Sequence, residues 1–420
     1  MIINNQLANS QMAKVQTVNN YLNGSHKVLS RKDFKFTDGT LTTAKIVLQS
    51  IGSIVDFHAG LLCGTPVSIT GDTEKLKLIQ TIYKKGFFSV AELKIARNLY
   101  KFGNAYEYIY RKNGKILSKV IENSDAYPIY NDNGEYVQFE ERWINQLDNV
   151  EHEIIYTDTD VTTYVNGVKT DTYKNTTGLP IHYTNIDTDA TNIFGISLVG
   201  KLVPIMDEIE ELLSKAMDSV TALSLNPLGV SIGDRVQGSI DTDAVGACVN
   251  IESGGDYKWA TASLDTESIK LLLDNLLNQF YAVACVPSTV MGQSNIANVS
   301  ETSISIIYNQ AMSMAKRTAM GMQLGIAQRL EYIGMLSSDN YEDVNISFNM
   351  SRPVDNSSLM NDLKSQWEMG AISRETIIKC SPYTTDTDRE LMLIDNDNDY
   401  QNKHKTIVDN VDNVDNSKLD

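Results

Sequence analysis

The sequence predicts a chain of the mixed α+β class, in which helices flank an antiparallel β meander. Three Asn–Gly pairs, at Asn113–Gly114, Asn133–Gly134 and Asn166–Gly167, lie among alternating apolar and polar residues. Asn and Gly both tolerate the positive φ of a type I′ turn, so each pair indicates a hairpin. Before and after this stretch, as in Ala44–Leu62 and Ser300–Leu336, apolar or small residues recur at helical spacing.

The composition limits the classes of function. The chain has 420 residues and a formal charge of −17, a length typical of two or three domains at about 150 residues each. The acidic balance argues against a surface that grips nucleic acid by charge, although DNA held by confinement stays open. The four cysteines form no CxxC pair, which argues against a zinc ribbon and fits a reducing compartment.

The chain carries no predicted membrane or export signal. Its N-terminus is polar from the fourth residue, unlike a signal peptide. The segment from Asn275 to Ser300 has no charged residue, but Pro287 and several amides make it too polar for a bilayer span. We therefore expect a cytoplasmic protein, or one assembled from cytoplasmic material, with no membrane contact.

The elements follow in order along the chain. The helix Ala44–Leu62 ends at the turn Cys63–Pro66, and Thr73–Phe102 forms two helices broken near Gly86. The meander extends from Ala105 to about Tyr173. The remaining predicted elements are a helix from Ser197 to about Leu223 with a kink or late start at Pro204, a β section from Leu228 to Ala262, a helix from Leu264 to Ala284, a long helix from Ser300 to Leu336, a strand at 344–350, two helices of which the second starts at Ser373, and a disordered acidic tail after Asp395.

Two features leave alternatives open. Ala311, Ala315 and Ala319 are spaced four apart on the long helix, which indicates either tight packing within the chain or a seam between subunits. The segment Lys75–Lys119 holds eleven bases against Glu92 and Glu107. It is either a face for nucleic acid or an acidic partner, or a solvated surface, which is the more common role of a charge run.

A catalytic constellation is not evident. The sequence has no GxxxxGK[ST] phosphate cradle, no GxGxxG and no GxSxG, and its five histidines lack the spacing of metal ligands. Asp386, Asp388 and Glu390 could gather a divalent ion, or could instead charge the N-terminus of a helix. We expect no metal and no cofactor. A metal-dependent hydrolase using these carboxylates remains an alternative function, as does a monomeric adaptor with a basic face.

Several motifs occur in the order found in one known family. These are Tyr21–His26, Ile54–Asp56 with Gly64–Val67, Ala96–Tyr110, Gly195–Ser197 with Ile205–Asp207, Val286–Gly292 with Asn298 and Ser300, and Ile372–Thr376. Together they resemble the portal, or head–tail connector, proteins of tailed double-stranded DNA bacteriophages. The resemblance extends from about Asn20 to Asp395, with departures at Leu22 and Glu301.

The resemblance implies a portal fold that assembles as a ring of about twelve subunits at one capsid vertex. It assigns residues 1–195 to an N-terminal wing, 196–224 to a stem helix, 225–263 to a clip, 264–285 to a second stem helix that lines the channel, 286–300 to a tunnel loop, 301–353 to a long wing helix and strand, 354–395 to a crown, and 396–420 to the tail. Double-stranded DNA would pass through the channel, and no enzymatic activity would reside in this chain.

The resemblance also implies site residues and partners. The DNA channel would be lined by Gln293, Ser294, Asn295 and Asn298 of the tunnel loop and by Lys270 and Asp274 of the stem. The clip residues Arg235, Gln237, Asp241 and Asp243 would meet the terminase large subunit and later the head–tail adaptor, and Ala311, Ala315 and Ala319 would pack subunits together. The major capsid and scaffold proteins would be further partners in the virion. An uncharged loop can touch a DNA backbone without the strong binding of fixed lysines.

Overall fold

The structure is a computed structural model that describes residues 5–36, 39–71, 73–186, 193–221, 228–232, 256–260, 265–287, 305–339, 341, 344–350, 356–384, 387 and 389–396. The chain divides into two compact units. The first comprises residues 1–296 and 307–351, and the second comprises 297–306 and 352–420. Each unit is described by itself.

The N-terminal part of the first unit contains one helix that the sequence pattern did not indicate. Helix α1 (Asn5–Leu22) is followed by the 3₁₀ turn η1 (Lys27–Ser30) and by the short antiparallel pair β1 (Phe34–Phe36) and β2 (Gly39–Leu41). Helix α2 (Ser50–Cys63) starts six residues later than predicted. The predicted start at Ala44 is wrong because the amides of residues 44, 46 and 48 donate to side chains of a distant helix, as described below, and not to a helix of their own.

The predicted break near Gly86 is confirmed. Helix α3 (Thr73–Gly86) ends there and α4 (Phe88–Phe102) begins two residues later, with Phe87 between them in the left-handed region at φ 55°. A Cβ on Gly86 would come within 2.8 Å of the Ile116 carbonyl oxygen and closer still to the Phe88 ring. Glycine therefore allows the junction of α3 and α4 to lie directly against strand β5.

The predicted meander is present but is divided between two sheets. Strands β4 (Asn104–Lys112) and β5 (Lys115–Ile121) form a three-stranded sheet with β11 (Ile181–Thr184), in the order β11-β4-β5. A five-stranded antiparallel sheet has the order β10-β9-β8-β7-β6 and contains β6 (Ala126–Tyr130), β7 (Tyr136–Asn145), β8 (Val150–Tyr156), β9 (Asp160–Val165) and β10 (Val168–Lys174).

Two of the three Asn–Gly pairs form the expected tight turns. Both residues have positive φ at Asn113–Gly114 and at Asn166–Gly167, as a type I′ turn requires. At Asn133–Gly134 only the glycine does. The connection there is longer because the Asn131 side-chain oxygen accepts from the amides of residues 133 and 135, which organises a wider turn.

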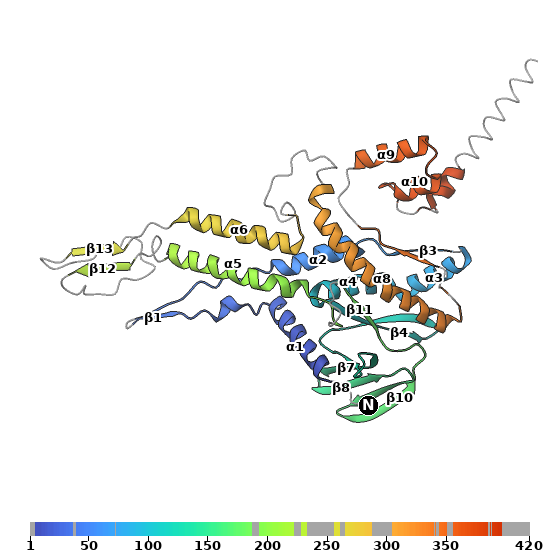
Figure 1. The fold of residues 1–420 in the computed structure, drawn as a ribbon, viewed down its shortest axis with the longest axis horizontal. Helices are drawn as coiled ribbons and strands as arrows, with labels where there is room; N and C mark the ends of the chain where they lie inside the picture. Colours follow the sequence, from blue (N-terminus) through green and yellow to red (C-terminus); the bar gives the residue numbers. More distant parts are fainter. Residues whose placement is uncertain are drawn as a thin grey trace, which may run out of the picture. The chain divides into compact units, whose positions relative to one another are not determined.

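The second half of the first unit is built on three long helices. Helices α5 (Leu198–Val220) and α6 (Thr266–Ala284) are separated in sequence by the antiparallel strands β12 (Leu228–Ile232) and β13 (Asp256–Ala260). Helix α8 (Asn309–Ser337) precedes β14 (Asn345–Ser347), which pairs with β3 (Ser68–Thr70). Figure 1 shows α5 and α6 extending away from the rest of the first unit, which we call its body. Helices α2, α4 and α8 lie together in the body.

The core of the first unit contains a buried ion cluster. Arg329 of α8 has no exposed surface and donates to Glu92 of α4 at 3.0 Å and to Glu107 of β4 at 2.9 Å. Burial raises the pKa of Glu92, and the Arg329 guanidinium opposes that shift. The cluster joins α4, β4 and α8 through charged groups that are held away from water.

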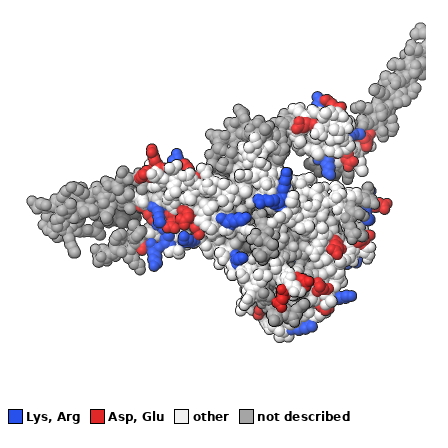
Figure 2. Space-filling view, in the orientation of Figure 1, with Lys and Arg blue, Asp and Glu red and all other residues white. Residues whose placement is uncertain are grey.

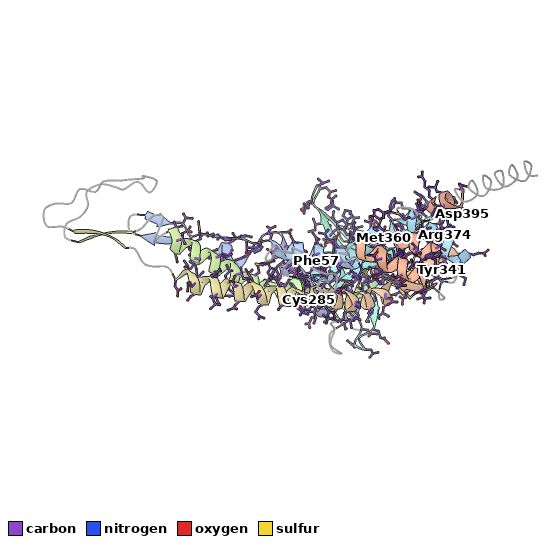
Figure 3. All side chains as sticks on the ribbon, turned by 90° about the horizontal axis from the view of Figure 1, so that it is seen from above. Phe57, Cys285, Tyr341, Met360, Arg374 and Asp395 are labelled. Atoms are coloured by element: carbon purple, nitrogen blue, oxygen red, sulfur yellow. The ribbon has the colours of Figure 1, made fainter. Side chains whose placement is uncertain are left out.

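The second unit contains α9 (Asn356–Glu368) and α10 (Arg374–Cys380). Ser373 is the N-cap of α10 and its hydroxyl accepts from the Thr376 amide at 3.2 Å, as the predicted helix start requires. Arg374 pairs with Asp395 at 3.1 Å, and both residues are labelled in Figure 3.

Candidate functional site

The start of helix α5 is fixed on the end of α4. The Ser197 hydroxyl accepts from the Gly200 amide at 2.9 Å, as an N-cap, and donates to the Lys101 carbonyl of α4. Gly103 and Gly195 lie so close together that a Cβ on either one would overlap the other's backbone. The helix therefore begins at Leu198, before Pro204, and the late start that the proline suggested is wrong.

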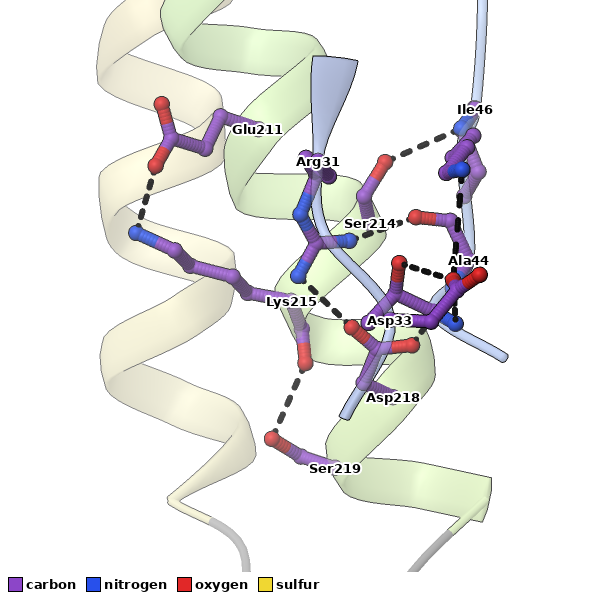
Figure 4. A network of polar contacts seen from close by, with 11 residues as sticks. Arg31, Asp33, Ala44, Ile46, Glu211, Ser214, Lys215, Asp218 and Ser219 are labelled. Atoms are coloured by element: carbon purple, nitrogen blue, oxygen red, sulfur yellow. Dashed lines mark hydrogen bonds and ion pairs between the residues drawn. The ribbon is translucent and has the colours of Figure 1, made fainter. Parts of the chain in front are cut away.

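One face of α5 holds a segment from near the N-terminus, which we call the strap (residues 42–49). The amides of Ala44, Ile46 and Leu48 donate to the side chains of Asp218, Ser214 and Glu210, at 2.7, 3.0 and 2.7 Å. Figure 4 shows two of these contacts, those of Ala44 and Ile46, beside α5. Alternate amides of the strap thus meet every fourth residue of the helix, in antiparallel order.

The spacing of the two segments explains this match. Two residues of extended chain span about 6.6 Å, and four residues of helix rise about 6.0 Å. Arg31 adds a second tie, because its guanidinium donates to the Ala44 carbonyl at 2.5 Å and to Asp218 at 2.7 Å. The strap therefore holds α5 to the body of the unit along about two helical turns.

Glu210 joins the strap to the N-terminal helix. Its carboxylate lies 2.8 and 3.0 Å from Nδ1 of His26, and neither side chain is exposed. Because a carboxylate only accepts, Nδ1 of His26 carries the proton. Burial, with Glu210 and Asp207 nearby, raises the pKa of Tyr21, whose ring lies 3.9 Å from that of His26. One buried carboxylate thus ties the strap amide of Leu48 to the segment that follows α1.

Helix α6 packs along α5 and exposes the rest of its surface. Figures 1 and 3 show the two helices side by side. Phe280 and Ala284 are buried, while Leu271, Leu272 and Val283 are exposed. From Asn275 to Pro287 the chain has no charged side chain, so the exposed surface in this part of α6 is polar or apolar but uncharged.

The C-terminal end of α6 is fixed on helix α2. Nε2 of His58 donates to the Ala284 carbonyl at 2.7 Å, and His58 is fully buried. Burial lowers the pKa of His58 to about 4, so the ring is neutral at physiological pH. Cys285 then ends the helix in the left-handed region at φ 52°. A neutral imidazole therefore ties α2 to the point where the chain leaves α6.

The predicted channel residues are only partly within the described chain. Lys270 and Asp274 lie four residues apart on α6 and are both exposed. The remaining predicted channel and clip residues lie outside the described residues, namely Gln293, Ser294, Asn295, Asn298, Arg235, Gln237, Asp241 and Asp243.

The alanine stripe of α8 lies inside the first unit. Ala311 and Ala315 have no exposed surface and Ala319 has 7%. Ala311 and Ala315 pack with Leu61 of α2 in one buried cluster. Further along the helix, a Cβ on Gly325 would overlap the Tyr183 ring. Tight packing within the chain is thus one of the two expected reasons for the spacing that the structure shows, and a role of these alanines between subunits stays a prediction.

The basic segment Lys75–Lys119 divides into buried acids and exposed bases. Its two acids, Glu92 and Glu107, are buried with Arg329. Arg97 pairs with Asp56, and Lys119 pairs with Glu141. Among the described residues, seven exposed bases have no ion-pair partner: Lys77, Lys84, Lys85, Lys94, Arg111, Lys112 and Lys115. The segment is therefore more strongly basic at its surface than its composition suggests.

The described residues offer no metal centre and no membrane span. No group of three or more His, Cys, Asp or Glu side chains among them could hold a metal ion. Asp386 and Asp388 of the predicted acidic group lie outside the described residues. Within the described part of the chain, none of the helices is both long enough and apolar enough to cross a bilayer.

The comparison with protein families decides the relationship. The family described as "Phage portal protein, SPP1 Gp6-like" matches residues 5–404, nearly the whole chain. The chain belongs to this family. The match spans the α5 and α6 pair, the strands between them and helix α8, so the family assignment applies to the architecture described above.

Solved structures similar to this portal family member include chains of gene transfer agent particles. The neck of an empty particle, computed with C6 symmetry, has a chain with 11% identity and a TM-score of 0.48, covering 81% of this chain and 88% of that one. The neck of a native particle with C12 symmetry has 11% identity and a TM-score of 0.48, covering 78% and 87%. No curated protein matches the chain.

Some residues of this site were not found from the sequence. Glu210, Ser214 and Asp218 follow one another at a spacing of four on α5, which places them on one face of the helix. That spacing was a usable signal, because three polar groups beside an apolar stripe need partners when they are buried. Phe87 was not found either, since its left-handed backbone depends on the packing of Gly86.

Proposed function

We propose that this chain forms the ring-shaped channel for double-stranded DNA at one capsid vertex of a tailed phage. The genome would pass through it during packaging by the terminase and again during ejection, and the head–tail adaptor would join it after packaging. Membership of the portal family supports this proposal. The observation that carries it in the structure is the α5 and α6 pair, whose second helix exposes an uncharged surface from Asn275 to Val283.

The uncharged surface suits a channel that must release DNA at every step. A fixed ring of lysines would bind phosphates and displace counterions, and each step would then cost the free energy of breaking those contacts. Amide side chains such as Asn278 and Gln279 instead make weak hydrogen bonds that water can replace. The net charge of −17 adds repulsion that keeps the DNA away from the walls.

The predicted subdivisions keep their roles in this proposal. Helices α5 and α6 form the stem, the strands β12 and β13 belong to the clip, and Gln293, Ser294, Asn295 and Asn298 narrow the channel. Lys270 and Asp274 of α6 line the channel along the stem. The clip residues Arg235, Gln237, Asp241 and Asp243 meet the terminase and the adaptor. ATP hydrolysis belongs to the terminase, and this chain acts as a structural component of the virion assembled in the host cytoplasm.

The ring is tested on the purified chain. Native mass spectrometry and negative-stain imaging at low and high salt should give an assembly of about twelve copies with a central hole. A chain that remains monomeric in both conditions would contradict the ring.

The channel surface is tested by adding charge to it. The double substitution of Asn278→Lys and Gln279→Lys should slow DNA packaging into particles and shorten the packaged genome. Thr172→Lys on the exposed strand β10 is the control, because it adds a lysine on a strand that Figure 1 shows well apart from α6. Ser294→Lys with Asn295→Lys tests the tunnel loop in the same way. Unchanged packaging rate and DNA length in both α6 and loop variants would refute the channel assignment.

A further inference from the structure

Phe87 is unusual both in its backbone conformation and in its exposure to water. It is 70% exposed, and its backbone lies in the left-handed region at φ 55°. A bulky side chain in that region is strained relative to a right-handed conformation, and exposing an aromatic ring to water gives up the free energy of burying it. The close packing of Gly86 against Phe88 and Ile116 accounts for the backbone of this junction but leaves the Phe87 ring exposed, and exposed apolar side chains at constrained backbone positions concentrate at functional surfaces.

Exposed residues of α3 and α4 on both sides of Phe87 in the sequence make up what we call the basic face (Leu78, Lys84, Lys85, Phe87, Val90, Leu93 and Lys94). Val90 and Leu93 follow Phe87 at intervals of three on α4 and are 53% and 39% exposed. Lys84 and Lys85 end α3, and Lys94 lies one residue after Leu93. None of these three lysines has an ion-pair partner among the described residues. An apolar stripe is thus bordered by unpaired positive charge.

A second surface of the same unit has the opposite charge. The turn between β7 and β8 carries Leu147, which is 96% exposed, and Ile144 near the end of β7 is 61% exposed. Asp148 and Glu151 lie beside them and are exposed. Figure 2 shows acidic side chains gathered over the part of the molecule that holds β7 and β8. We call this surface the acidic turn (Ile144, Leu147, Asp148 and Glu151).

The acidic turn is held in a fixed shape. The Leu147 amide donates to the Asn145 side-chain oxygen at 3.1 Å, and the Asn149 amide donates to the Asn145 carbonyl at 2.8 Å. The Glu151 amide donates to the side chain of Asn166 at 3.0 Å. The exposure of Leu147 therefore belongs to an ordered turn, and a partner that covers it need not order the turn first.

We propose that the acidic turn of one copy of this chain binds the basic face of the next copy. This contact rests on the proposed ring. Copies that associate head to tail bind through two different surfaces of the same chain, and those two surfaces must be complementary. Both surfaces present exposed apolar side chains, and their charges are opposite. Covering Phe87 with the Leu147 of a neighbour would bury both apolar groups and pair the three lysines with Asp148 and Glu151.

Two charge-reversal variants test the interface, and each is designed to bind the other but not itself. One variant carries Lys84→Glu, Lys85→Glu and Lys94→Glu, and the other carries Asp148→Lys and Glu151→Lys. Each alone should reduce ring formation at least tenfold, because like charges then face each other. An equal mixture should restore rings in which the two variants alternate, and native mass spectrometry resolves this by mass. Circular dichroism of each variant verifies folding.

The outcomes separate this inference from the proposed function. Rings formed normally by both single variants would overturn the interface while the ring itself stands. Failure of the mixture to assemble, although both variants are folded, would also overturn it. Absence of rings from the unmodified chain would overturn the proposed ring and the interface together.

A cross-link provides the second measurement. Val90→Cys and Leu147→Cys in one chain should give, with a short bismaleimide, a ladder of linked copies up to the ring size. Val90→Cys alone is the control for the native cysteines and should give no ladder. No ladder from the double variant in assembled rings would overturn the contact, since both side chains are exposed in the single chain.

Discussion

Glu210 should be the residue on which the attachment of the strap depends most. Its carboxylate is fully buried and accepts from the Leu48 amide at 2.7 Å and from His26 Nδ1 at 2.8 Å. Glu210→Ala leaves both donors without an acceptor, and an unsatisfied buried donor costs about 1–3 kcal/mol. The free energy of unfolding should therefore fall by about 3 kcal/mol, within limits of about 2 and 6 kcal/mol.

Glu210→Gln is the matched control. Its side-chain oxygen can still accept from the Leu48 amide, and its NH₂ group can donate to Nδ1 of His26. The His26 proton would then move to Nε2, which has no partner among the described residues. Because Nε2 lacks a partner in the unmodified chain as well, and both contacts to residue 210 survive as hydrogen bonds, we expect this variant to lose only about 1 kcal/mol.

The assay combines urea unfolding with hydrogen exchange resolved at single amides. In the unmodified chain the amides of residues 44, 46 and 48 should exchange slowly, whereas those of 45 and 47, for which no acceptor is found among the described residues, should exchange fast. Glu210→Ala should release Leu48 first. Equal losses of stability in the Ala and Gln variants, or equal exchange along the strap, would refute the reasoning.

Three further predictions concern the core. Arg329→Met should lower the free energy of unfolding by about 3–5 kcal/mol in urea, because Glu92 and Glu107 lose their buried counterion; a loss below about 1 kcal/mol would contradict this. Burial lowers the pKa values of His58 and His182 to about 4. In the unfolded chain the imidazole pKa values are near 6.5, so below that pH the unfolded chain binds more protons than the folded one. The free energy of unfolding should therefore fall as pH drops from about 6.5 to 4, by on the order of 3 kcal/mol for each ring. A free energy of unfolding that does not change over this pH range would contradict the prediction. Gly325→Ala should lower the melting temperature, because its Cβ would overlap the Tyr183 ring, while Gly60→Ala, which has open space around it, should raise the melting temperature slightly. A higher melting temperature for Gly325→Ala than for Gly60→Ala would show that helix α8 shifts freely.

The order of the elements could be predicted from local sequence because local physics determines them. Asn–Gly pairs fixed two hairpins, Ser197 and Ser373 marked helix starts, and Gly86 marked a break. The helix start at Ala44 could not be predicted correctly. The apolar residues that follow Ala44 recur at helical spacing, but the amides of residues 44, 46 and 48 donate to side chains of α5, more than 160 residues away. A contact of that range leaves no trace in the local pattern.

The site was predicted less completely than the fold. Lys270 and Asp274 lie exposed on α6 as expected for channel residues, and their role stays a prediction. The alanine stripe of α8 was ambiguous because close packing against α2 and against another subunit require the same small residues. Glu92 and Glu107 lower the net positive charge counted over the segment Lys75–Lys119, but both side chains face inward toward Arg329. A count of charges along the sequence does not distinguish inward from outward side chains.

The strap also restricts where α5 can change in length. Inserting one residue between Glu210 and Asp218 would turn the rest of the helix by about 100° and carry every later acceptor away from its strap amide. An insertion after Asp218 would leave all three contacts in place. Helix α5 can therefore be lengthened or shortened at the end that leads to β12, while its other end keeps its register on the strap. Related chains with a longer or shorter α5 would present the segment after the helix at different distances without altering the residues to which α5 is attached.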